Sequence, residues 1–556
     1  MKINLLLILL LININFIQSF KCGADQIKLN PKSITFSSSK KTQNLSKANA
    51  ESETPLVIGY DFSTLQRPSS MTTTTYNNIK SALIGVSEEF SKFLKISHRQ
   101  ISLEGMKNTI MDYCGLSVIG ADYENFLIKN DIIIFPQFDS SLDSSVIAAA
   151  GACIIEKDSN HPYGGVLYIN PNINFGNKNI NVYMKNILLH EITHILIFSP
   201  GIIGSLRLNN TINGVPHIIS KNVVAKAKEH FGCNSMEGVP LENQGGSGTM
   251  GSHWESRYML GDYMVSTDFP DSAISDITLA LFEDSGFYKV NYYSGGLFKF
   301  GKNEGCGFFN QKCIINERAT FDDFCDESNE PLCSSSKTIK SSCYLITYPS
   351  QVPTAYQYFS NKRRGGFTYA DYCPIPYESI DNSDYFPKHC QFGSSSSNYG
   401  EKLGSNSFCF MSSIVQSSSN DINEVPVCYE IECDSSSQKI IVKIGDNRIE
   451  CPSGGGSVSP SSSGLKGTID CPAYSELCPS NNILCNDIYT CLTQYAKRDN
   501  YNYATSAYNY EGSTLTRDND DDDDDGDIAP LTYKDSSFLR TNFALFMAIF
   551  LLFIAN

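Results

Sequence analysis

The apolar positions of residues 53–200 follow two different periods. In residues 77–96 and again in 180–198 they recur every three to four positions, which predicts two helices that each bury one face. "DIIIFPQF" (131–138) and "GGVLYINP" (164–171) are short apolar runs rich in β-branched or aromatic residues, and both predict buried strands. This alternation favours an α+β or α/β fold, and we expect α+β. An edge strand beside the second helix would offer a peptide a ladder of backbone hydrogen bonds.

The pattern changes after about residue 300, where long helical periods disappear and cysteine, serine, tyrosine and glycine become frequent. Of the 19 cysteines, fifteen lie between Cys306 and Cys491. We therefore expect a disulfide-rich, mostly β or irregular C-terminal domain at 306–500. An odd total leaves one cysteine without a partner in the same chain. Residues 501–537, which contain the run Asp520–Asp525, are predicted to be an acidic linker.

Both ends of the chain carry short apolar runs. Lys2 followed by Leu5–Leu11 is typical of a secretory signal peptide, assigned to residues 1–20, with a buried N-terminal helix as the alternative. The polar residues 21–52 are predicted to be a pro-segment or linker. Residues 538–556 end in thirteen apolar positions, which favours a glycolipid (GPI) anchor signal over a retained membrane segment. Both interpretations place the protein at a membrane, facing outward.

Composition excludes one class of partner. The chain has 556 residues, 41% of them hydrophobic and 18% charged, with a net charge of −16. Because no basic block offsets this charge, nothing would release counterions from a phosphate backbone, and we expect no nucleic-acid partner. Oligomeric state cannot be inferred from these features.

The segment "LLHEITHILIFSP" (188–200) carries candidate chemistry. His190 and His194 are four positions apart, so on a helix they share one face and can bind one metal ion. Glu191 lies about 100° around the helix and can reach a water on that metal. Pro200 and Gly201 are predicted to end the helix. Two helical histidines are by themselves common, and catalytic zinc needs a third protein ligand. The short metzincin motif would place glycine at 197 and histidine at 200, where this chain has Ile197 and Pro200.

A third ligand is found farther along the chain. "GVPLENQGGSGTMGSHWESRYMLGDYM" (238–264) has a glycine-rich stretch before His253 and a methionine, Met264, eleven residues after it. This segment resembles the leishmanolysins, surface zinc metalloproteases of the metzincin clan, in which a long insertion separates the second and third zinc histidines. The resemblance extends over about residues 55–490, with "CYEIEC" (428–433) resembling that family's cysteine-rich domain.

The resemblance implies an architecture and a site. It implies a metzincin-type catalytic domain with a long insertion, divided into residues 53–200 and 201–305, ahead of the cysteine-rich domain. It implies one Zn²⁺ per chain on His190, His194 and His253, with Glu191 as the catalytic base. Met264 is the methionine expected under the metal. The implied function is a secreted or cell-surface zinc endopeptidase that acts on proteins or peptides, attached to the membrane through its C-terminus.

Two departures affect this interpretation. The family has glycine where this chain has Ile197, and a β-branched residue is strained if the position requires a positive φ. Cys22 is the candidate for a pro-segment thiolate that holds the enzyme latent, although an ordinary disulfide is an equal alternative. His98, His161, His217, His230 and His389 are expected on the surface or in loops, and Trp254 is expected to pack beside the site.

Two other functions remain open. Ile197 favours a catalytically inactive adhesion or binding protein that keeps the protease fold. The three histidines together with Glu191 disfavour this alternative. A zinc hydrolase of non-peptide substrates would share the same metal chemistry, and only the resemblance in residues 238–264 disfavours it.

Overall fold

The computed structural model describes residues 53–173, 180–244, 249–267, 272–292, 298–377, 388–390, 400–419, 423–461, 464–478 and 507–518, and the backbone of 32–34; side chains of 180–183 are not included. The predicted signal peptide, most of the pro-segment with Cys22, the acidic run and the C-terminal apolar run lie outside these residues. Residues up to Thr516 form one compact unit.

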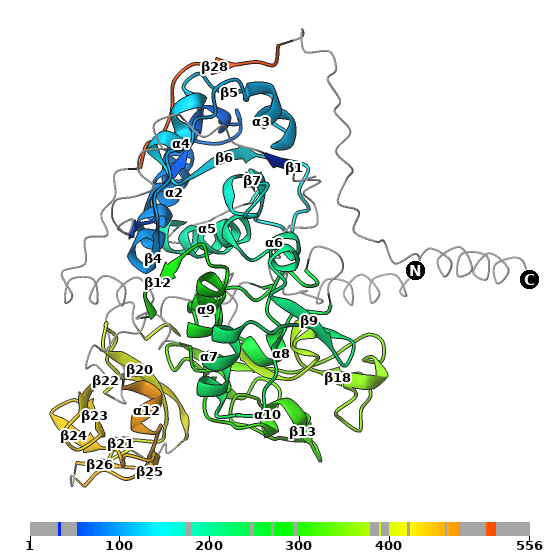
Figure 1. Ribbon diagram of the computed structural model, residues 1–556. Helices are drawn as coiled ribbons and strands as arrows, with labels where there is room; N and C mark the ends of the chain where they lie inside the picture. Colours follow the sequence, from blue (N-terminus) through cyan, green and yellow to red (C-terminus); the bar gives the residue numbers. More distant parts are fainter. Residues whose placement is uncertain are drawn as a thin grey trace, which may run out of the picture. The chain divides into compact units, whose positions relative to one another are not determined.

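A five-stranded sheet organises the first part of the chain (Figure 1). Its order is β1 (Lys32–Ile34), β7 (Ala148–Glu156), β8 (Pro162–Ile169), β6 (Ile132–Phe138) and β3 (Ile58–Tyr60). Neighbouring strands are parallel except β7 and β8, which are antiparallel. The strands predicted at 131–138 and 164–171 are confirmed as β6 and β8. Together with its helices, the chain has the mixed helix and strand content expected of an α+β protein.

The first predicted helix is α2 (Thr73–Phe93), which begins and ends earlier than expected. The Thr72 side chain accepts a hydrogen bond from the Thr75 amide and so caps the first turn. Residues 94–96, expected to be helical, form strand β4 (Leu94–Ile96) between β2 (Thr54–Pro55) and β12 (Lys289–Val290). The apolar period continued into β4 because both elements bury the same side of the chain.

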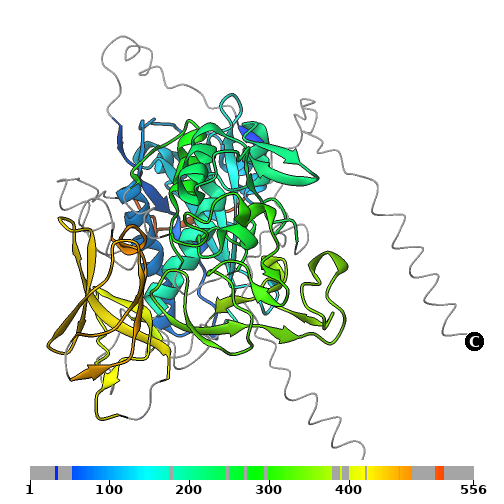
Figure 2. The same cartoon turned by 90° about the horizontal axis from the view of Figure 1, so that it is seen from below.

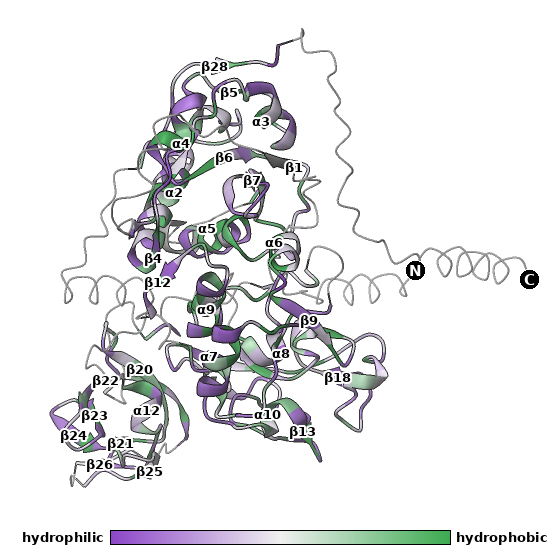
Figure 3. Ribbon diagram, in the orientation of Figure 1, coloured by the Kyte–Doolittle hydropathy of each residue, from purple (hydrophilic) through white to green (hydrophobic). Residues whose placement is uncertain are grey.

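The second predicted helix is α5 (Ile180–Leu196), which packs on α2 and on strands β7 and β8. The stretch Met184–Ser205 is apolar enough to span a membrane by composition, but 72% of its apolar window is buried inside the protein. Much of α5 is accordingly coloured hydrophobic in Figure 3. Pro200 does not end this helix. It begins the next one, α6 (Pro200–Ser205), whose N-terminus is capped by the Ser199 side chain.

One glycine permits the close approach of α5 to the sheet. A Cβ atom on Gly165, in β8, would lie 2.6 Å from Cγ2 of Ile195 and 2.7 Å from the carbonyl oxygen of Gly151. Real Cβ contacts essentially never occur at that distance. The glycine therefore fixes how deeply the helix that carries the histidines sits on the strands.

Strand β7, which pairs with β8 on one side and with β1 on the other, was not predicted from the sequence. Its first residues, Ala148–Ala152, are mostly alanine and glycine and lack the β-branched signature of a strand. Only Ile154–Glu156 of β7 pair with β1.

The chain after α6 continues the same hydrophobic core through to Tyr377. Its elements up to residue 310 are β9 (Asn209–Ile212), β10 (Val215–Ile218), α7 (Lys221–Phe231), β11 (Val239–Pro240), α8 (Ser256–Met259), α9 (Asp276–Asp284) and α10 (Gly307–Asn310). Short strands follow: β13 (Ile314–Ile315), β14 (Arg318–Ala319), β15 (Pro331–Cys333), β16 (Lys340–Tyr344), β17 (Ile346–Thr347), β18 (Arg364–Gly365) and β19 (Ile375–Tyr377). No helix longer than four residues lies among the described residues after 306.

A separate core lies between Phe408 and Cys478. It is built on a six-stranded sheet, drawn in yellow to orange in Figure 2. The strands in sheet order are β24 (Asn447–Glu450), β23 (Lys439–Ile444), β22 (Val425–Asp434), β20 (Ser407–Ser412), β27 (Ile469–Cys471) and β25 (Gly456–Val458). A pair of short strands, β21 (Val415–Gln416) and β26 (Leu465–Lys466), and the short helix α12 (Tyr474–Leu477) complete this region.

The expected disulfide framework is confirmed. The described residues hold eight disulfides: Cys114–Cys153, Cys233–Cys306, Cys313–Cys373, Cys325–Cys343, Cys333–Cys409, Cys390–Cys428, Cys433–Cys478 and Cys451–Cys471. Cys22, Cys485 and Cys491 lie outside the described residues. Cys333–Cys409 joins a strand of the main core region to the six-stranded sheet, so the two parts are covalently cross-linked.

The close packing of α5 on the sheet at Gly165 leads to a prediction about stability. Gly165→Ala places a methyl group against Ile195 and should lower the free energy of unfolding by about 1–3 kcal/mol, the usual cost of overpacking. The matched control is Gly204→Ala in α6, where an added Cβ meets no atom within 4 Å. Urea unfolding of both variants measures the difference. Equal stability of the two would show that α5 does not rest on Gly165.

Candidate metal centre

Three histidines converge on one point. His190 and His194 project from α5, one helical turn apart, and His253 comes from the chain 59 positions after His194. The Nε2 atom of His190 lies 3.1 Å from that of His194 and 3.2 Å from that of His253. Among the described residues, these three form the group of side chains that could hold a metal ion. The structure thus brings together all three predicted ligands.

The second ring nitrogen of each histidine is held by a backbone carbonyl. Nδ1 of His190 donates to the Tyr263 oxygen at 2.6 Å, and Nδ1 of His194 donates to the Phe198 oxygen at 2.7 Å. Nδ1 of His253 lies 3.2 Å from the Thr249 oxygen and 2.9 Å from the Ser252 hydroxyl oxygen. A carbonyl can only accept, so each Nδ1 carries the proton and each Nε2 presents a lone pair to the shared point.

This donor set fits zinc. Tetrahedral zinc with Zn–N bonds of about 2.0–2.1 Å requires ligand nitrogens about 3.3 Å apart, close to the separations found here. Burial lowers the pKa of His190 to about 3 and that of His194 to about 4, and it holds the pKa of His253 well below its usual range. All three rings are therefore neutral near pH 7, the form that binds a metal. His194 and His253 are buried, whereas His190 keeps part of its surface exposed.

The backbone beside His253 fixes the third ligand. The Glu242 amide donates to the His253 oxygen, and the Gly251 amide donates to the Glu242 oxygen, both at 2.9 Å. These two bonds close the base of the glycine-rich loop. Gln244 directly precedes the glycine-rich residues, and its side chain donates a hydrogen bond to Asp371 at 2.7 Å. Gln244 thereby ties this part of the chain to the region after residue 306.

Met264 lies in a turn that reaches the three histidines through its neighbour Tyr263. Met264 is fully buried, and its backbone oxygen accepts from the Trp254 amide at 3.0 Å. Asp262 accepts hydrogen bonds from the Met264 amide at 2.7 Å and from the Thr278 hydroxyl at 2.8 Å. Tyr263 supplies the carbonyl for His190, so this turn orients a ligand as well as supporting it.

Sequence reasoning missed Asp262, Tyr263 and Thr193. The hydroxyl groups of Tyr263 and Thr193 lie 2.9 Å apart, and this contact joins the turn to α5. Burial raises the pKa of Asp262 to about 6, yet its hydrogen bonds favour the charged form. The signal was present as "GDYM", in which Gly261 has a φ of 87° that requires glycine. Trp254 packs edge-on against Phe198, beside the site, as predicted.

Glu191 is buried on α5 next to the first histidine, with 2% of its surface exposed. As the neighbour of His190 on a helix, its side chain leaves the axis about 100° from that ring. Glu191 is not part of the three-histidine group that could hold a metal.

The backbone at Ile197 is not strained. Ile197 does not have a positive φ, so the expected conflict with a β-branched residue does not arise. The amides of Ile197 and Phe198 both donate to the Thr193 oxygen at 2.9 Å, and the chain turns away within residues 197–199. This turn is what brings the Phe198 carbonyl to Nδ1 of His194.

The expectation for the remaining histidines is partly wrong. His161 and His389 are buried, and His230 stacks on Phe298 at 4.7 Å between ring centroids. His161 precedes β8 and packs against Tyr163 and Phe287. These rings fill apolar space as aromatic side chains do, which isolated positions in a sequence do not reveal.

Comparison with known proteins relates this site to one family. The leishmanolysin family model matches residues 81–484, and the leishmanolysin homolog of Crithidia fasciculata is 29% identical over 391 residues. Leishmanolysin of Leishmania tropica is 28% identical over 365 residues, and the leishmanolysin-like peptidase of Drosophila melanogaster is 29% identical over 311 residues. The matched regions cover 66%, 61% and 49% of this chain and 58%, 53% and 46% of those proteins, respectively. The chain thus spans about half the length of these relatives.

The buried His161 predicts a pH dependence of stability. Burial lowers the pKa of His161 to about 3, and its Nδ1 has no hydrogen-bond partner among the described residues. Below pH 6.5 the unfolded chain binds a proton at His161 that the folded chain does not. The contribution of this residue to the free energy of unfolding is therefore greatest above pH 6.5 and falls as the pH decreases. His161→Phe should therefore reduce the loss in unfolding free energy between pH 7.5 and 5 by about 2 kcal/mol. Urea unfolding at both pH values tests this, and an unchanged loss would contradict the assignment.

Proposed function

The chain belongs to the leishmanolysin family, and on that premise we propose that it is a zinc-dependent endopeptidase acting on proteins or peptides outside the cell. One observation carries the proposal: the Nε2 atoms of three histidines cluster around one point while each Nδ1 is hydrogen-bonded on the other side of its ring, to a backbone carbonyl and, for His253, also to the Ser252 hydroxyl. Packing alone does not require three imidazoles to present lone pairs to one point, whereas metal binding does.

His190, His194 and His253 would hold one zinc ion per chain. A zinc ion in such a site supplies a Lewis acid that makes a water acidic near neutral pH and polarises a carbonyl group. The carboxylate of Glu191 takes the proton from the attacking water and then gives it to the nitrogen of the leaving amine. The buried Met264 keeps the underside of the histidine rings apolar and fixed.

The substrate backbone would lie along β7. Of this strand, only Ile154–Glu156 pair with β1 among the described residues, so the outer edge of Ala148–Ala152 is the candidate ladder for an extended peptide. The side chains of this stretch are small, and α5 packs against the same strand.

The alternative of an inactive adhesion or binding protein loses its main support. That alternative depended on strain at Ile197, and the backbone there is relaxed. An inactive scaffold would also have no need for Glu191 beside an intact set of three ligands. A hydrolase of non-peptide substrates keeps the same chemistry, and the family relationship favours the peptidase.

Location and maturation are also proposed from the sequence. Residues 1–20 would direct secretion, residues 21–52 would be a pro-segment, and residues 538–556 would be replaced by a GPI anchor or retained as a membrane tail. Cys22 remains the candidate for latency. The division into a catalytic part (53–305), a cysteine-rich domain (306–500) and an acidic linker (501–537) belongs to the same proposal.

Replacing the proposed base tests the function. Glu191→Gln should retain bound zinc and lower the rate of casein cleavage by about 10²–10⁴-fold, the usual contribution of general acid–base catalysis. The matched control is Glu88→Gln, the same change at an exposed position of α2, which should cleave at the wild-type rate. Zinc content and cleavage with and without a chelator are measured together. Wild-type cleavage by Glu191→Gln would overturn the role of Glu191.

A further inference from the structure

The last described segment of the chain returns to the first sheet. We call residues 507–516 the C-terminal strap. They lie beyond the part of the chain matched by the family, which ends at residue 484. Within the strap, β28 (Thr514–Leu515) pairs antiparallel with β5 (Ile119–Gly120), and Tyr510 forms a parallel bridge with Asp61 (Figure 1). The strap therefore adds to the edge of the sheet at β3.

Backbone hydrogen bonds hold the strap along that edge. The Tyr510 amide donates to the Tyr60 oxygen at 2.9 Å, and the Phe62 amide donates to the Tyr510 oxygen at 2.8 Å. The Tyr60 amide donates to the Asn509 side-chain oxygen at 2.9 Å. Farther along, the Ala121 amide donates to the Ser513 oxygen at 2.8 Å. These bonds satisfy donors and acceptors that an edge strand would otherwise expose.

Asn130 binds both backbone groups of Tyr508. Its Oδ1 accepts from the Tyr508 amide at 2.9 Å, and its Nδ2 donates to the Tyr508 oxygen at 3.0 Å. Asn130 is fully buried, and Nδ2 also donates to the Phe126 oxygen. Its side chain is thus fixed in the orientation that binds an extended backbone.

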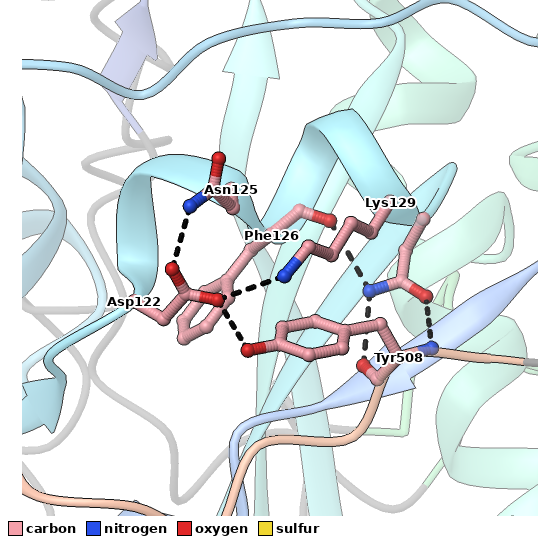
Figure 4. A network of polar contacts seen from close by, with 6 residues as sticks. Asp122, Asn125, Phe126, Lys129 and Tyr508 are labelled. Carbon is pink, nitrogen blue, oxygen red and sulfur yellow. Dashed lines mark hydrogen bonds and ion pairs between the residues drawn. The ribbon is translucent and has the colours of Figure 1, made fainter.

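Side chains of the strap fit a matching surface. The rings of Tyr508 and Tyr510 lie 6.4 and 5.9 Å from that of Phe126. The Lys129 ammonium lies 3.6 Å above the Tyr508 ring, and the Tyr508 hydroxyl donates to Asp122 (Figure 4). Tyr508, Tyr510 and Leu515 all pack on the second hydrophobic core of this subdomain.

Two glycines leave space for the strap. A Cβ on Gly120 would lie 2.4 Å from Cδ1 of Tyr510, and a Cβ on Gly59 would lie 2.5 Å from the Tyr508 oxygen. Both positions would collide with the strap if they carried any side chain. At Gly59 the added atom would also lie 2.3 Å from Nδ2 of Asn130, whereas at Gly120 the nearest atoms belong to the Tyr510 ring, so Gly120 is the position that keeps space for the strap.

We propose that the surface formed by β3, β5, Asn130 and the helix α4 (Phe126–Lys129) is a peptide-binding groove, filled in this protein by its own strap. The ligand class is an extended peptide with tyrosines two positions apart, the second followed by an acidic residue. Glu511 is that residue, and it pairs with Lys80. The strap anchors the chain to the catalytic subdomain at Thr516, immediately before the sequence that leads to its C-terminal apolar run. This inference does not depend on catalysis.

Weakening the strap should open the groove to a peptide supplied from outside. In the full chain, Tyr508→Ala with Tyr510→Ala removes both rings from the intramolecular occupant. A fluorescent synthetic peptide with the sequence of residues 506–517 should then bind, measured by anisotropy, at least about tenfold more tightly than it binds the wild-type chain, where the tethered strap competes at high effective concentration. Equal binding to both, or to neither, would overturn the proposal.

Matched glycine variants test where the peptide binds. Adding Gly120→Ala to the double variant should abolish binding, because the new Cβ occupies the place of the Tyr510 ring. Gly204→Ala in the same background should leave binding unchanged, since its Cβ meets no atom within 4 Å. Loss of binding in both, or in neither, would show that the peptide binds elsewhere.

Hydrogen exchange on the wild-type chain provides a test that requires no variant to fold. The amides of Phe62 and Ala121 should be protected, because the strap carbonyls of Tyr510 and Ser513 accept from them. Exchange of both amides at the rate of unstructured peptide would refute the strap. Light scattering on the same sample should give the mass of a monomer, so that the protection can be assigned to contacts within one chain. Protection found only in a dimer would mean that a second copy supplies the occupant, which would contradict the intramolecular assignment.

Discussion

The metal centre depends on the placement of three backbone carbonyls. An imidazole can present Nε2 to a metal in a fixed direction only if its Nδ1 proton is held elsewhere. Here the three acceptors belong to the turn after α5 (Phe198), the turn around Met264 (Tyr263) and the glycine-rich loop (Thr249). Two regions of the chain, the turn after α5 and the stretch from Thr249 to Tyr263, must therefore reach their native positions before a metal can be bound by all three histidines.

Contacts elsewhere in the fold hold these carbonyls and the histidines in position. Gly165 lets α5 sit directly on the sheet, so the two histidines of the helix have a fixed depth. Asp262 holds the turn that supplies both Met264 and the Tyr263 carbonyl, and Thr278 ties Asp262 to α9. The glycine-rich loop is fastened through Gln244 and Asp371 to the region after residue 306. The cysteine-rich part of the chain thereby contributes to the geometry of a site formed mostly by earlier residues.

Sequence patterns predicted the parts of this site that have a fixed spacing. The separation of His190 and His194 on a helix, and the strands β6 and β8, could be predicted directly because they follow helical or strand periods. His253 required a resemblance, since no period links it to α5. Strand β7 escaped prediction because alanine and glycine carry no strand signal. The C-terminal strap escaped it because its hydrogen-bond partners lie 378 to 449 positions away. The concern over Ile197 was wrong because the family's glycine marks a turn that this chain makes without a positive φ.

X-ray absorption at the zinc edge, on secreted protein purified without added metal, tests the central claim most directly. We predict one zinc per chain, bound by three imidazole nitrogens at about 2.0–2.1 Å and one oxygen. In His253→Gln, the nitrogen count should fall to two or the metal should be lost. A wild-type protein without zinc, or with sulfur ligands at about 2.3 Å, would contradict the assignment of this site.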